Sequence, residues 1–329
     1  MNKSAFGAVR LTPEEKAAAT AANIAFEQRL AQLPSVGATG FFGPESMTWK
    51  IYKEPTMLLG GISALLLQIA HPAIAEGVRK FSNFHEEYLY RAHRTFNSMA
   101  SFYFGSEKQA LSTARRLFAM HGMIRGNIGK KIDGWWQVEK FCARDPELLT
   151  WVLATLVETS LRITELMHGP LPQSDKEQFF EESKIIATLM GIPPENYPND
   201  YSAFERYYEI MLQSDTLKVT PVNMRLANII LNPPYGSHRI FRAMAAVFLP
   251  EKFAMAYQMM PSPTEKKWID RLVRFMRIVL KITPPFFRFA PPYHQARWRS
   301  TQQHKKWHPG YFYTLLTRHF KFPFGLKMD

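Results

Sequence analysis

The chain has 329 residues, of which 46% are hydrophobic and 14% aromatic, and its formal net charge is +13. This composition is typical of a globular protein with a large core and excludes a largely disordered chain. The only cysteine, Cys142, excludes an internal disulfide framework and any metal site built from several cysteines. Residues 1–260 carry 27 Lys and Arg against 25 Asp and Glu, whereas residues 261–329 carry 14 against 3. A neutral body with a basic end indicates that one segment meets an anionic surface.

The N-terminal segment, residues 1–36, is expected to form one amphipathic helix over residues 12–33. Thr12 is a suitable cap, Pro13 suits the first turn, and Glu14 and Glu15 complement the positive helix end. Charges throughout the first thirty residues leave no apolar stretch of the kind found in secretory signals. We therefore expect no secretory signal and a cytoplasmic protein, peripheral to the membrane if it meets one.

The next strong feature is an apolar run over residues 56–80, with no charge from Met57 to Ala75. Its length reaches that of a membrane span, but Gln68, His71 and Pro72 interrupt it, and we expect the central buried helix of a large domain. Proline disfavours helical geometry at the residue before it. His71 therefore serves either a local structural role at a kink or helix end, or a cofactor, and the sequence leaves both open.

Residues 91–126 are predicted to form two antiparallel helices joined at Phe104, Gly105 and Ser106. At roughly 1.5 Å per residue, Arg91 lies about 21 Å before the turn and His121 about 24 Å after it. The two residues are therefore expected at one level of the hairpin. This spacing is compatible with an iron porphyrin that has His121 as its axial ligand and polar groups opposite.

The rest of the body also has helical patterns, over residues 147–167, 174–190, 201–213, 221–231 and 238–249, and strand signals are nearly absent. The sequence therefore predicts an all-α, multi-helix single domain. Glu158 falls within an apolar stretch, and a buried carboxylate must be paired or neutral. An arginine such as Arg125 is its expected partner, and the alternative is a catalytic acid.

Several enzyme classes are disfavoured because the sequence lacks their motifs. The chain has no G-x-S-x-G elbow, no phosphate-binding P-loop, no G-x-G-x-x-G fingerprint and no H-E-x-x-H pair. Hydrolases, ATPases and nicotinamide dehydrogenases are therefore disfavoured. No two histidines of the first half are spaced as a helical zinc pair, whereas a single axial imidazole demands no such spacing.

Five segments occur in an order and spacing that resemble a known family: GFFGPESMTW, LLLQIAHPAIAEGV, Arg91-x-x-Arg94-Thr95, AMHGMIRG and DPELLTWVLATLVETSLR. The family is that of the haem oxygenases of the latex clearing protein (rubber oxygenase) and MpaB type, many of them uncharacterised. The resemblance spans roughly residues 37–250. It places a haem oxygenase-like helical domain at residues 37–260.

The resemblance implies a globin-like core that holds haem b. His121 would be the proximal iron ligand and Arg125 the arginine that follows it, while Arg91 and Thr95 would lie on the dioxygen side. His71 and Arg94 are further candidates for cofactor contact. The implied activity is that of an oxygenase acting on an apolar organic substrate.

Two positions depart from the family pattern. Arg94 stands where some relatives have a lysine able to ligate resting iron, and arginine has no free lone pair for a metal. Leu153 stands where many relatives have a histidine. The first departure predicts that no side chain at position 94 ligates the iron.

The basic, aromatic extension over residues 261–329 interleaves cations with apolar residues at helical spacing around residues 266–281. It is expected either to pack on the domain or to lie on an anionic membrane surface. Nucleic acid is not an expected partner, because no recognition module accompanies the charge. The alternatives to an oxygenase are a non-catalytic haem sensor or carrier, and a haem-free helical protein of membrane surfaces.

Overall fold

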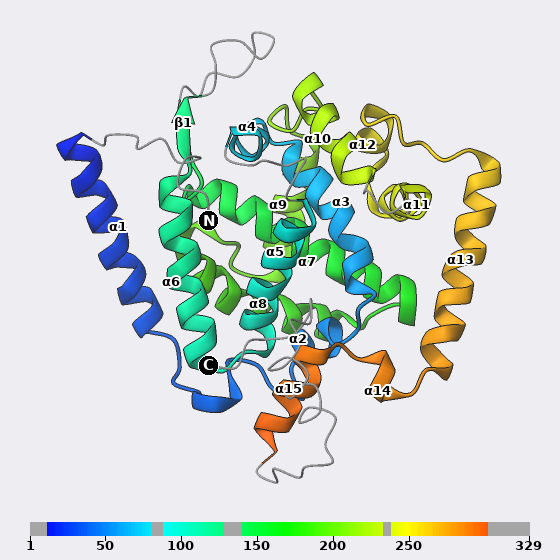
Figure 1. The fold of residues 1–329 in the computed structure, drawn as a ribbon, viewed down its shortest axis with the longest axis horizontal. Helices are drawn as coiled ribbons and strands as arrows, with labels where there is room; N and C mark the ends of the chain where they lie inside the picture. Colours follow the sequence, from blue (N-terminus) through cyan, green and yellow to red (C-terminus); the bar gives the residue numbers. More distant parts are fainter. Residues whose placement is uncertain (1–11, 81–87, 128–139, 233–237, 302–329) are drawn as a thin grey trace.

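The computed structural model describes residues 12–80, 88–127, 140–232 and 238–301, and this part of the chain is almost entirely helical (Figure 1). Its elements are α1 (Pro13–Ala31), η1 (Gly37–Thr39), α2 (Met47–Tyr52), α3 (Met57–Ile69), α4 (Pro72–Lys80), α5 (Tyr88–Phe104), α6 (Glu107–Met123), β1 (Arg125–Asn127), β2 (Lys140–Cys142), α7 (Pro146–His168), α8 (Gln173–Met190), η2 (Pro194–Asn196), α9 (Tyr201–Gln213), α10 (Pro221–Leu231), α11 (His238–Phe248), α12 (Glu251–Ala256), α13 (Pro263–Ile282), α14 (Pro285–Arg288) and α15 (Pro291–Ser300). The all-α prediction is confirmed. The antiparallel pair β1–β2, with Arg125 opposite Cys142, was not predicted.

The helix boundaries follow local signals in the sequence. Thr12 and Glu15 form a reciprocal capping box at the start of α1, and the Asp145 side chain accepts a hydrogen bond from the Glu147 amide at the start of α7. Gly191 ends α8 in the left-handed conformation, with φ of +93°. The predicted helices at 201–213 and 221–231 match α9 and α10 in both limits.

The core is organised around α3 and α7, which pack along each other near the centre of the molecule (Figure 1). Gly60 permits this close approach, because a β-carbon there would lie 2.6 Å from the Thr159 methyl group. Trp151 of α7 is fully buried and its indole nitrogen donates to the Leu67 carbonyl of α3 at 3.2 Å. One large hydrophobic cluster reaches from α1 to α15, which supports the prediction of a single domain.

The expected single helix over residues 56–80 is wrong in one respect, because the chain forms two helices that meet at 103°. The break falls at Ala70 and His71, where Pro72 begins α4. Within the described residues no single helix is long and apolar enough to cross a membrane, although the bent pair α3–α4 passes by length and composition.

The segment after residue 260 contacts the body through three helices. α13 lies along the outer edge against α7 and α11, and α15 packs against α5 and η1 (Figure 1). The buried Glu54, before α3, holds the connecting α14: Arg288 donates to its Oε1 from Nε at 2.8 Å and Nη2 at 2.5 Å. His168 Nε2 lies 2.9 Å from Oε2 of the same carboxylate. The C-terminal helices are thus tied to the core by a buried ionic cluster.

We expect Glu54→Ala to destabilise the protein by about 3 kcal/mol, since removing one partner leaves Arg288 without its carboxylate. Burial raises the pKa of Glu54, but the hydrogen bonds from His168 and Arg288 outweigh burial, so its pKa is lowered. A lowered carboxyl pKa stabilises the folded state above the ordinary carboxyl range and ceases to do so as the pH falls through the folded value. The free energies of unfolding of the wild type and of Glu54→Ala, measured with urea, should therefore differ less in acid than at pH 7.

The matched control is Glu27→Ala, which removes a salt bridge to Arg115 whose side chains are both half exposed. Such a pair contributes less than about 1 kcal/mol. Equal losses for the Glu54 and Glu27 variants would contradict the assigned importance of the buried cluster.

Candidate functional site

The predicted hairpin is present as α5 and α6, joined through Gly105 and Ser106. The Ser106 side chain caps α6 by accepting from the Gln109 amide. Further along the pair, Arg94 Nη2 lies 3.4 Å from Met120 Sδ. Because His121 follows Met120, the histidine end of α6 lies beside the turn of α5 that carries Arg94. This contact agrees with the predicted antiparallel hairpin, while the level of Arg91 with His121 stays a prediction.

His121 lies in the last turn of α6 and is half-buried. Its Nδ1 atom is enclosed and has no hydrogen-bond partner among the described residues. Burial, assisted by the nearby charge of Arg144, lowers the pKa of His121 to about 4. The imidazole is therefore neutral at pH 7 and retains a lone pair. Buried polar atoms without partners are rare in folded proteins, and a neutral imidazole is a common metal ligand.

Arg144 is the residue near His121 that sequence reasoning missed. Its Nε donates to the Phe118 carbonyl of α6 at 2.6 Å, and its guanidinium lies over the Phe118 ring, 4.0 Å from the centroid. Gly122 makes room for it, because a β-carbon there would lie 2.4 Å from the guanidinium carbon. The only signal in the sequence was a glycine directly after a candidate ligand, which does not identify the arginine that fills the space.

Arg125 was predicted to contact the cofactor, and the structure gives it a different contact. Its Nε and Nη2 both donate to the Gly122 carbonyl, at 2.8 and 2.6 Å. That carbonyl belongs to the last turn of α6, where helix carbonyls lack partners within the helix. Arg125 therefore caps the helix end that carries His121, and its contact with a cofactor stays a prediction.

The opposite helix, α5, carries the predicted dioxygen-side residues. Arg91 belongs to α5, but its side chain lies outside the described residues, and the Thr95 and Arg94 side chains are exposed. Asn97 was not predicted: its Oδ1 is buried without a partner among the described residues, while its Nδ2 lies 3.1 Å from His93 Nε2. The roles of Arg91 and Thr95 therefore stay predictions.

His71 lies at the break between α3 and α4 and is buried. Its amide donates to the Gln68 carbonyl, and its own carbonyl accepts from the Ala75 amide of α4. Burial lowers the pKa of His71 to about 4. Its place at a helix junction agrees with the structural role, while contact with a cofactor stays a prediction.

The two histidine-bearing segments are connected by a small apolar cluster. Ala73 and Ile74, just after the break at His71, pack with Phe141 and Leu148 and with Ile124 at the end of α6. The start of α4 therefore supports the same end of α6 that positions His121.

Glu158 pairs with an arginine, as expected, but that arginine is not Arg125. Its Oε1 instead accepts from Arg162 Nε at 2.6 Å, one turn along α7. An i, i+4 partner on the same helix was available, and such pairs form without tertiary constraint.

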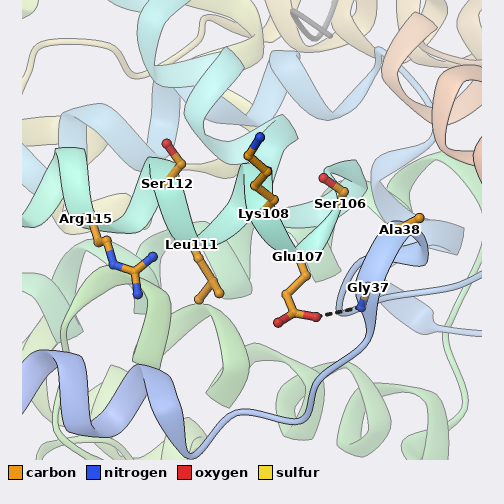
Figure 2. Close-up of a pocket in the computed structure, with 8 residues that line it drawn as sticks. All are labelled: Gly37, Ala38, Ser106, Glu107, Lys108, Leu111, Ser112 and Arg115. Carbon is orange, nitrogen blue, oxygen red and sulfur yellow. Dashed lines mark hydrogen bonds between the residues drawn. The ribbon is translucent and has the colours of Figure 1, made fainter. Parts of the chain in front are cut away.

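A surface hollow of about 720 Å³ lies at the other end of α6 (Figure 2). The Glu107 carboxylate projects there and accepts from the Gly37 amide at 2.6 Å, which holds the loop before η1. His121 is fourteen residues further along the helix, or about 21 Å. This hollow is therefore separate from the histidine site. Within the described ranges no three His, Cys, Asp or Glu side chains gather as a metal site.

Comparison with known proteins shows the family to which the chain belongs. Residues 49–278 match the family model described as "ER-bound oxygenase mpaB/B'/Rubber oxygenase, catalytic domain". The chain is also 22% identical over 233 residues to Uncharacterized protein Mb2261 of Mycobacterium bovis and to Uncharacterized protein Rv2237 of Mycobacterium tuberculosis. Each alignment covers 67% of this chain and 87% of the relative. The match takes in α5, α6 and α7, and the chain belongs to this family of oxygenase catalytic domains.

Proposed function

We propose that the protein is a haem b-dependent oxygenase that acts on an apolar organic substrate, with His121 as the axial iron ligand. Membership of an oxygenase family supports the reaction class. The observation that carries the cofactor assignment is His121 itself, with an enclosed Nδ1 that has no partner in the described part of the chain and a pKa lowered to about 4.

The chemistry of the side chains around His121 suits a haem. A neutral imidazole has the lone pair that an axial ligand must give, whereas an imidazolium has none. Arg144 and Arg125 lie at the same helix end and supply positive charge suited to an anionic cofactor. Arg94, on the facing helix, has no free lone pair and cannot compete with His121 for a metal.

Each residue then has a defined role in the proposal. His121 would hold the iron, and the cap formed by Arg125 on the Gly122 carbonyl orients the end of α6 that carries it. Arg91 and Thr95, one turn apart on α5, supply hydrogen-bond donors on the dioxygen side. When bound, haem supplies the redox chemistry that activates dioxygen, and the chain supplies position and polarity.

The first test is the visible spectrum of the purified protein expressed with ample haem. We expect a Soret band that is lost or shifted in His121→Ala and shifts again when the reduced protein binds carbon monoxide. His168→Gln is the matched control, since His168 pairs with Glu54 away from the hairpin, and it should keep the wild-type spectrum.

Haem-free wild-type protein would contradict the proposal and favour a helical membrane-surface protein. A normal haem spectrum with autoxidation but no product from apolar substrates such as polyprenes would favour a sensor or carrier. An unchanged Soret band in His121→Ala would reject His121 as the ligand while leaving the cofactor in place.

The second test is the titration of His121 in the haem-free protein, followed by NMR of the imidazole protons and assigned with His121→Gln. We expect a pKa near 4, and a higher value in Arg144→Gln that still lies below the ordinary 6.5, because burial is the larger cause. The unfolded histidine binds a proton below about pH 6.5 and the folded one does not. Stability should therefore fall as the pH drops from 6.5 towards 4, and less so in His121→Gln. A His121 pKa near 6.5 would contradict the buried, neutral ligand.

A further inference from the structure

Helix α13 has two apolar faces, of which one is used in folding. Ile269 and Val273 are buried against α11, and Leu272, Met276 and Leu280 pack on the hydrophobic cluster formed by α7 and α11. These positions recur at the three- and four-residue spacing of one helix face. The inner face therefore fixes α13 to the body.

The second face points outward. Phe275, Ile278, Val279 and Ile282 are 62%, 58%, 37% and 73% exposed, and their spacing of i, i+3, i+4 and i+7 places them on one stripe. Phe287 on α14, just beyond the helix, is 73% exposed. The four residues on α13 are here called the outer stripe, and with Phe287 they are five of the eleven large hydrophobic side chains that are strongly exposed in the described residues. Such clustering is typical of an interaction surface.

Cations accompany the outer stripe. Lys267, Arg271, Arg274 and Lys281 are exposed on α13, and none of them forms an ion pair with another described residue. At 100° per residue, Lys267, Arg274 and Lys281 fall along one side of the stripe, and Arg271 falls within it. The helix thus presents apolar side chains next to cations that have no ion pair among the described residues.

We propose that the outer stripe and its cations bind the surface of an anionic phospholipid membrane. Phe275, Ile278, Ile282 and Phe287 would enter the interfacial layer while the lysines and arginines contact lipid phosphates. α13 lies at the edge of the molecule, away from the α5–α6 hairpin, so this surface is free to meet a plane without involving the candidate haem site (Figure 1).

Charge favours this occupant over a second copy of the chain. A symmetric dimer in which the two α13 helices run antiparallel would bring two rows of cations together, and like charges at an interface are unfavourable. A nucleic acid would use the cations but gives the exposed aliphatic side chains no partner. An anionic lipid surface satisfies both features of the helix at once.

The experiment is co-sedimentation of the full-length protein with phosphatidylcholine vesicles and with vesicles that also contain phosphatidylserine. We expect strong binding only to the anionic vesicles. Phe275→Ser with Ile282→Ser, and separately Arg271→Gln with Arg274→Gln, should each lower the partition coefficient roughly tenfold or more. High salt should weaken the vesicle binding of the wild type, and it should weaken that of the Arg271→Gln with Arg274→Gln variant less.

Ile210→Ser is the matched control, because Ile210 is 67% exposed on α9, and it should bind as the wild type does. Far-UV circular dichroism and thermal unfolding verify that each variant is folded. If the stripe variants prove unfolded, Ile278→Cys in a Cys142→Ser background keeps the test valid. A polarity-sensitive dye at position 278 should shift to the blue on anionic vesicles, and the same dye at Ile210→Cys should not.

Equal binding to neutral vesicles, or binding unchanged in both double variants, would overturn the proposal. So would a concentration-dependent dimer that Phe275→Ser with Ile282→Ser dissociates, in a protein that ignores vesicles. The measurement is independent of haem, so its outcome does not decide the proposed oxygenase function.

Discussion

The constraint on which the rest of the structure depends is the burial of the end of α3. The last carbonyls of a helix have no partner within it, and here they lie in the core rather than in water. Tyr257 donates its hydroxyl to the Leu66 carbonyl, Trp151 donates to Leu67, and Asn223 donates to Ile69. The Lys218 amide donates to the Ala70 carbonyl. Segments from α7, α10 and the end of α12 are thereby held around one point.

That arrangement also determines where the chain goes next. With α3 stopped at the core, Pro72 begins α4 at 103° to it and directs Ala73 and Ile74 towards Ile124 at the end of α6. The position of His121 thus depends on a helix end more than fifty residues earlier. The same support explains why a histidine can remain neutral there: the packing that orients the ring also removes the water that would stabilise its charged form.

Most of the fold could be predicted because local signals decide helix limits. Thr12, Asp145 and Gly191 start or end helices through contacts within one helical turn, so the helix limits that they determine can be predicted without the tertiary structure. The missed features all require knowledge of distant neighbours. Arg144 reaches Phe118 across 26 residues, and β1–β2 forms only because its two halves meet. Of the candidate site, spacing could predict the hairpin, whereas the contacts made by guanidinium groups could not be inferred from spacing.

The C-terminal segment shows that packing on the domain and contact with a membrane do not exclude each other. A helix has enough circumference for two apolar stripes, and on α13 the stripe through Val273 and Met276 is separate from the one through Phe275 and Ile282. The first is shown to be packed, and the link from Arg288 to Glu54 holds the following turn against the core. A helix fixed in this way presents its second stripe in a constant orientation. Membrane contact through it would therefore need no folding step. A disordered basic tail loses conformational entropy when it binds, whereas α13 would already have lost that entropy when the protein folded.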